Sequence, residues 1–139
     1  MRLVDANVLV YAVNRDEPHH DRARRWLDRA LGGREAVGFT WTVLLAFVRV
    51  TTRPIFPRPL DVGKAVQVTR DWLDQPPAVI VEPTDRHLGL VGGLLAETGT
   101  AGNLVNDAHL AALALEHDAT VWTFDSDFGR FEAVRWHQP

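Results

Sequence analysis

Arg2-Leu-Val-Asp5 and Thr120-Val-Trp-Thr-Phe-Asp125, at opposite ends of the chain, are short apolar runs that both stop at an aspartate. Runs of this length and composition predict buried strands. If the strands lie in one parallel sheet, their carboxyl ends share an edge, and the aspartates converge there. Asp127 follows closely, and Asp107 is expected to open a helix. Because like charges held close resist joint ionisation, this cluster predicts a bound divalent cation.

The remaining pattern alternates strands and helices. Further strands are expected at 36–40, 78–82 and 133–136, and helices at about 18–31, 41–52 and 62–73, from Thr84 or Asp85 through Leu95, and from Asp107 onward. This order predicts a three-layer α/β/α fold with a mostly parallel sheet of about five strands and helices on both faces. No linker or repeat divides the chain, so a single domain over residues 1–139 is expected.

Composition limits the classes of function. The chain has 139 residues, a formal net charge of −3 and no cysteine. The charge argues against a protein that coats nucleic acid by bulk electrostatics, but it does not exclude an enzyme with a local basic rim. No apolar run approaches the roughly 18 residues of a membrane span, and no export signal is evident, so we expect a cytoplasmic protein without membrane contact. Without thiolates, any metal is held by oxygen or imidazole.

Carboxylate ligands favour Mg²⁺ or Mn²⁺, and these ions suit phosphodiester hydrolysis. Each aspartate alone has a simpler reading as a helix cap or a turn; the combination favours the metal site. Arg49 and Arg53 lie four residues apart at a helix end, where they either hold phosphates or are solvated charges. His109 lies two residues after Asp107, and a surface role is favoured over metal ligation.

Three segments together resemble a known family. They are Leu3-Val-Asp5-Ala-Asn7, Gly102-Asn-Leu-Val-Asn-Asp107-Ala-His-Leu-Ala and Thr123-Phe-Asp125-Ser-Asp127-Phe-Gly-Arg-Phe. Over essentially the whole chain the sequence resembles a PIN domain, and more narrowly the VapC-type ribonuclease toxins of toxin–antitoxin pairs in mycobacteria and related actinobacteria.

The resemblance implies a Mg²⁺- or Mn²⁺-dependent endoribonuclease that cuts structured RNA such as tRNA or rRNA. It also implies a cognate VapB-type antitoxin and a homodimer. Asp5, Asp107 and Asp125 match the metal-binding residues, and Asp127 adds to the acidic group. Asn7, Thr42, Arg49, Arg53 and His109 are the expected supporting residues.

One position departs from the family pattern. PIN domains usually carry a glutamate on the helix after the second strand, and the matching residue here is Ala46. Either Asp127 and water replace that ligand, or activity is weakened. A weakened module that binds RNA or antitoxin without turnover is therefore the alternative function. A phosphoacceptor signalling domain is disfavoured, because such a domain generally needs a lysine at the end of its last strand. The only lysine here, Lys64, lies on a mid-chain helix.

Overall fold

The computed structural model describes residues 1–139 and contains one five-stranded sheet. The strands are β1 (Arg2–Val4), β2 (Val37–Phe39), β3 (Ala78–Ile80), β4 (Thr120–Trp122) and β5 (Trp136–His137), in the order β3-β2-β1-β4-β5. All four neighbouring pairs are parallel. The expected sheet is therefore confirmed, although β5 lies further along the chain than predicted.

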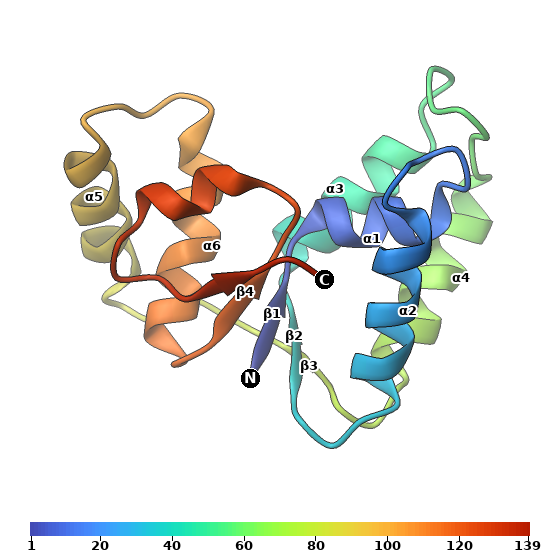
Figure 1. Ribbon diagram of the computed structural model, residues 1–139, viewed down its shortest axis with the longest axis horizontal. Coiled ribbons are helices and arrows are strands. Elements are labelled where there is room, and N and C mark those ends of the chain that lie inside the picture. The colour runs from blue at the N-terminus through green and yellow to red at the C-terminus, as the bar shows by residue number, and fades with distance from the viewer.

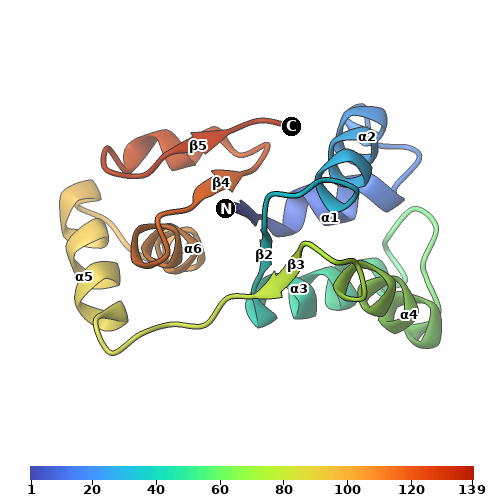
Figure 2. The same cartoon turned by 90° about the horizontal axis from the view of Figure 1, so that it is seen from below.

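Helices cover both faces of the sheet. They are α1 (Ala6–Val13), α2 (His20–Leu31), α3 (Trp41–Thr51), α4 (Val62–Leu73), α5 (His87–Thr98) and α6 (Leu104–Glu116), followed by the 3-10 helix η1 (Ser126–Arg130). Figure 1 shows α5 and α6 on one side of the strands and α1 to α4 on the other, and Figure 2 shows the same division from below. This confirms the three-layer α/β/α fold. No helix is both long and apolar enough to cross a membrane.

The sheet order places the carboxyl ends of β1 and β4 side by side. From β1 the chain proceeds outward to β2 and β3 on one side, whereas β4 and β5 lie on the other. The register pairs Val4 with Trp122, so the residues that follow each strand emerge at the same edge. A parallel α/β sheet opens a crevice where the strand order diverges in this way. The expected convergence of Asp5 with the segment after β4 is therefore built into the topology.

Two helix starts differ from the sequence-based expectation. The prediction that Asp107 opens a helix is wrong, because α6 begins at Leu104 and Asp107 lies in its first turn. Leu104 is buried, so the extra residues have an apolar anchor. The prediction that Thr84 or Asp85 caps α5 is also wrong: the helix begins at His87 without a side-chain cap, and the Thr84 hydroxyl instead donates to Glu116.

Buried side chains from both helical layers meet the sheet in one hydrophobic core. Gly38 in β2 shows how tightly the centre is packed. A Cβ at this position would lie 2.8 Å from Val81 Cγ2, closer than Cβ atoms come to other atoms, and at a tight 3.1 Å from Leu3 Cδ1. Any side chain at position 38 would therefore force Val81 and Leu3 to shift. This dense centre gives the strand ends that carry the acidic residues a rigid base.

Candidate functional site

Asp5 is held in one orientation by its neighbours. It is the N-cap of α1, and its Oδ1 accepts a hydrogen bond from the Ala6 backbone N–H at 2.6 Å. Its Oδ2 accepts from Asn7 Nδ2 at 2.8 Å and from the Thr123 hydroxyl at 2.6 Å. The capping bond explains why α1 starts directly after β1. A carboxylate restrained on both oxygens is well suited to a fixed ligand position.

Thr123 joins Asp5 to the acidic segment after β4. Besides donating to Asp5, its buried hydroxyl accepts from Asn7 Nδ2 and from the Asp125 backbone N–H, each at 2.9 Å. One hydroxyl has one hydrogen and two lone pairs, so all its bonding capacity is used. Asn7 Oδ1 also accepts from the Phe124 N–H at 3.1 Å. Sequence reasoning did not single out Thr123; its position between strand β4 and Asp125 was the available signal.

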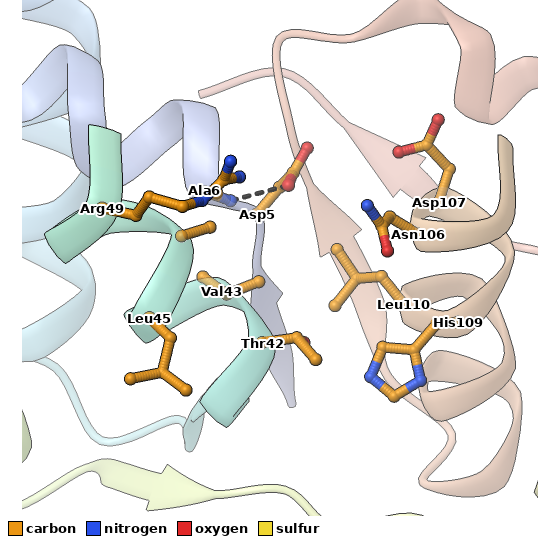
Figure 3. A pocket seen from close by; sticks show the side chains of 11 residues that line it. Asp5, Ala6, Thr42, Val43, Leu45, Arg49, Asn106, Asp107, His109 and Leu110 are labelled. Atoms are coloured by element: carbon orange, nitrogen blue, oxygen red, sulfur yellow. Dashed lines mark hydrogen bonds between the residues drawn. The ribbon is translucent and has the colours of Figure 1, made fainter. Parts of the chain in front are cut away.

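Asp5 and Asp107 face the same cavity. Its volume is about 370 Å³, and its walls come from the start of α1, from α3 and from α6. Figure 3 shows Asp5 at the end of β1 and Asp107 on the first turn of α6, with the α3 side chains opposite α6. Asp125 and Asp127 lie beside this cavity rather than in its wall, and the Asp127 N–H donates to Asp125 Oδ1 at 2.8 Å.

The aspartates interact electrostatically. The pKa of Asp107 is raised to about 6, mainly by burial and then by the charges of Asp5, Asp125 and Asp127, in that order of importance. Burial also raises the pKa of Asp5, against hydrogen bonds from Thr123, Ala6 and Asn7 that lower it and the charge of Asp125 that raises it. The site therefore concentrates negative charge in a partly desolvated place.

Little positive charge compensates this cluster. Asp127 pairs with Arg130 at 3.5 Å, whereas Asp5, Asp107 and Asp125 have no ion pair. Carboxylates without a counter-charge, all offering oxygen, fit a hard divalent cation. The side chains do not form a preformed cage, because no three acidic or imidazole groups stand close enough to hold one ion. Mg²⁺ commonly uses one or two direct carboxylates and completes its shell with water.

The opposite wall of the cavity comes from α3. Thr42, Ala46 and Arg49 line it, and Figure 3 shows the Arg49 side chain extending toward Asp5. Arg53 lies beyond the end of α3 and outside the cavity wall. Asn106, which sequence reasoning did not select, lines the cavity from α6. The structure thus brings Arg49 to the site but not its neighbour four residues on.

A family model for the PIN domain matches residues 2–134. The chain belongs to the PIN-domain family. Within it the chain falls in the VapC group: it is 56% identical over 140 residues to ribonuclease VapC37 of Mycobacterium tuberculosis, covering 100% of this chain and 97% of that protein. It is 36% identical over 140 residues to ribonuclease VapC33 of Mycobacterium tuberculosis, covering 100% and 98%. The resemblance seen in the sequence is confirmed.

Solved structures show the same fold at low sequence identity. VapBC2 from Rickettsia felis, bound to a promoter DNA fragment, matches with a TM-score of 0.72 and 19% identity over 99% of this chain and 97% of that one. VapC20 of Mycobacterium tuberculosis, described as a sarcin-ricin loop cleaving toxin, matches with a TM-score of 0.69 and 16% identity over 93% of each chain.

Two residues of the cavity wall bear on the set of metal ligands: Ala46, which the sequence marked as a departure from the family pattern, and His109, which it disfavoured as a ligand. Ala46 lines the cavity with Asp5 and Asp107, so this position of α3 brings a methyl group and no carboxylate to the cavity. His109 also lines the cavity, but its Nδ1 lies 2.7 Å from His87 Nε2 and so bonds away from the carboxylates. No third acidic ligand therefore comes from α3.

Proposed function

We propose that this protein is the toxin of a type II toxin–antitoxin pair and an endoribonuclease that hydrolyses RNA phosphodiester bonds with Mg²⁺ or Mn²⁺. The observation that carries the proposal is the placement of Asp5 and Asp107 in one cavity at the point where the strand order diverges. Their raised pKa values, without paired cations, support a role in holding a divalent ion. The ribonuclease names of VapC37 and VapC33 support RNA as the substrate.

Different residues would bind the ion and orient its ligands. Asp5 and Asp107 would hold the ion, and Asp125 with Asp127 adds negative charge beside it. A bound divalent ion supplies Lewis acidity and lowers the pKa of a water molecule. The Thr123 hydroxyl fixes the Asp5 carboxylate, so the ligand loses little freedom when the ion binds.

The α3 wall suits the phosphate backbone of RNA. Arg49 carries a guanidinium into the cavity that also holds the carboxylates of Asp5 and Asp107, and it forms no ion pair within the protein. A guanidinium fork matches two phosphate oxygens. Thr42 adds a hydroxyl, which lies 2.8 Å from the Thr40 hydroxyl. Arg53 is proposed to contact the same strand of RNA outside the cavity.

The proposed partners are a VapB-type antitoxin and a second copy of the chain, acting in the cytoplasm where tRNA and rRNA are found. An apolar groove of about 330 Å³ between α3 and α4 is the proposed binding site for a segment of the antitoxin. Its wall includes the exposed side chains of Trp41, Leu45 and Val66, and Leu45 also lines the acidic cavity. Solved neighbours include VapBC complexes from Rickettsia felis and Haemophilus influenzae.

The test is to incubate purified, antitoxin-free protein with total RNA, with and without Mg²⁺ or Mn²⁺, and to map the new ends. Asp5→Asn is expected to abolish cleavage while keeping the fold, which circular dichroism checks. Asp28→Asn, an exposed change on α2, is the matched control and should cleave normally. Full activity of Asp5→Asn, or cleavage in excess chelator, would refute the metal-dependent mechanism.

The second candidate is a PIN-like module that binds RNA or antitoxin without turnover. Ala46 in the cavity wall, together with the lack of a preformed three-ligand group, is the observation that favours it. Binding without new RNA ends, at any concentration of Mg²⁺ or Mn²⁺, would select this alternative.

A further inference from the structure

Three aromatic rings lie beside the acidic residues but outside the cavity wall. Phe124 directly precedes Asp125, and its ring centroid lies 4.7 Å from that of His19 and 5.3 Å from that of Tyr11. The rings of Tyr11 and His19 are 6.1 Å apart, with their planes 28° from parallel. None of the three lines the cavity, and the proposed metal chemistry uses none of them. We refer to these three residues as the aromatic cluster.

The aromatic cluster is held in place next to the carboxylates. The Phe124 backbone N–H donates to Asn7 Oδ1 at 3.1 Å, and Asn7 Nδ2 donates to Asp5 Oδ2 at 2.8 Å. Tyr11 lies one turn after Asn7 on α1, so both side chains project from the same side of that helix. The rings therefore lie next to the place where a scissile phosphate would bind.

Part of the aromatic cluster remains open to solvent. Tyr11, His19 and Phe124 are each half-buried, and Phe124 is the one phenylalanine of six that is not buried. An aromatic ring left partly exposed gives up some of the stabilisation that full burial provides. Proteins that bind single-stranded nucleic acid use such rings to stack bases.

Arginines continue from the aromatic cluster along one side of α2. Arg22 Cζ lies 5.6 Å from the centre of the Phe124 ring, and Arg22 donates to the Pro139 carbonyl at 2.7 Å. Figure 2 shows the C-terminal end of the chain pointing toward α2. Arg25 and Arg29 follow at helical spacing, so the three guanidinium groups share one side of the helix. We refer to these three residues as the arginine stripe.

The arginine stripe is a local basic surface in a chain of net charge −3. Helix α2 carries four arginines and two aspartates. Its one ion pair joins Arg24 to Asp28 at 3.9 Å, whereas Arg25 and Arg29 are exposed and form no ion pair. Exposed guanidinium groups without a counter-charge suit phosphates, because binding them releases counterions from the nucleic acid.

We propose that the aromatic cluster stacks an RNA base next to the scissile phosphate and that the arginine stripe binds the phosphates of the strand beyond it. The inference rests on the proposed ribonuclease function and adds a second part to the substrate site. The partner is a single strand or an unpaired loop of RNA, because only unpaired bases can be splayed out and stacked on a protein ring. Rings flanked by arginines contact the flat base and the charged phosphate that every such strand carries.

RNA binding measured without cleavage tests both contacts. The assay is fluorescence anisotropy of a labelled short single-stranded RNA, in excess chelator and at several salt concentrations. Phe124→Leu keeps an apolar side chain and should weaken binding about fivefold to tenfold, with little change in salt dependence. Arg25→Gln should weaken binding and reduce the slope of log affinity against log salt by about 0.7, the value for one phosphate contact on a single strand.

Two variants control for lost packing and lost charge. Trp72→Leu removes a half-buried ring that packs 4.8 Å from Phe47, outside the cavity wall, and should bind RNA like the unsubstituted protein. Arg34→Gln removes an exposed arginine shortly before β2, at the sheet edge opposite the carboxylates, and should leave the salt dependence unchanged. Urea unfolding checks that each variant is folded.

An abasic nucleotide, placed in turn at each position of the RNA, identifies the stacked base. At one position the unsubstituted protein and Phe124→Leu should bind the abasic RNA equally. The same loss on every abasic RNA, or normal affinity of Phe124→Leu or Arg25→Gln, would overturn the proposal. So would normal RNA binding by Phe124→Leu together with weaker binding of a polyglutamate peptide by Arg25→Gln, because the arginine stripe would then belong to an acidic protein partner.

The outcomes separate this inference from the proposed function. If the protein cleaves RNA and both variants bind it normally, this inference alone fails. If RNA is bound with the expected losses in the variants but is never cleaved, the proposed function fails and the two contacts remain assigned. Absence of RNA binding by the unsubstituted protein would overturn the inference.

Discussion

Removal of the Asp107 charge is expected to stabilise the metal-free protein while abolishing cleavage. The pKa of Asp107 rises from 3.8 to about 6 in the folded protein. The folded state therefore binds a proton more tightly than the unfolded chain, so stability is highest below the unfolded pKa and falls as the pH rises through about 6. At neutral pH the ionised group costs stability.

The size of the gain follows from the shift. A change of roughly two pKa units corresponds to about 3 kcal/mol, and screening at a half-exposed carboxylate reduces this to about 1–2 kcal/mol. Asp107 also lies in the first turn of α6, where a negative charge contributes about 0.3–1 kcal/mol through the helix dipole. Asp107→Asn loses that part, so the net gain in the free energy of unfolding is about 1 kcal/mol, or a rise in Tm of about 2–5 °C.

The assay is urea unfolding in the presence of chelator at about pH 7.5 and about pH 4. The gain in the free energy of unfolding of Asp107→Asn should be present at about pH 7.5 and lost at about pH 4. Asp21→Asn is the matched control: Asp21 occupies the first turn of α2, but it is exposed, so the change should slightly destabilise the protein at neutral pH. Mg²⁺ should then stabilise the unsubstituted protein and not Asp107→Asn. Equal stability of Asp107→Asn and the unsubstituted protein at neutral pH, or a gain of the same size in acid, would refute the electrostatic reasoning.

Two further changes test the support of the site. Thr123→Val keeps the shape of the side chain but removes the hydroxyl shared by Asp5, Asn7 and Asp125. It should therefore lower the free energy of unfolding by about 1–3 kcal/mol and reduce cleavage. A loss below about 0.5 kcal/mol in urea unfolding would contradict the bridging role of the hydroxyl. Gly38→Ala should lower the free energy of unfolding by about 1–3 kcal/mol through overpacking. Gly92→Ala, on α5 with open space around it, should raise the free energy of unfolding by up to about 1 kcal/mol. Similar Tm values for the two variants would contradict the packing analysis.

The strand ends and the acidic edge were predictable because they depend on local patterns and one topological rule. Short apolar runs locate β1 and β4, and the parallel sheet brings Asp5 and Asp125 to one edge. The short helix α1 was not predicted. Its eight residues are apolar apart from Asn7 and Tyr11, so they show no alternation of polar and apolar faces. Its start is marked only by the capping bond that Asp5 accepts from the Ala6 N–H, and this bond depends on where β1 ends.

Partnerships between distant residues were not predictable. Thr123 is separated from Asp5 by 118 positions, and nothing in its own neighbourhood shows that its hydroxyl will be buried against a carboxylate. His87 and His109 likewise lie 22 positions apart on two helices. Their contact depends on how α5 packs on α6, which no sequence periodicity specifies. Sequence thus locates the charged groups of the site, whereas the groups that orient them require coordinates.

Ala46 bears on how many cations the proposed mechanism needs. The residue lines the same cavity as Asp5 and Asp107, so a glutamate there would add a further negative charge to groups whose pKa values are already raised. With alanine, the cluster holds four aspartates, of which Asp127 is paired with Arg130. One divalent ion then offsets most of the remaining charge, and a second would find few free carboxylates. The substitution therefore favours a site built around a single ion, with Arg49 rather than a second metal facing the phosphate.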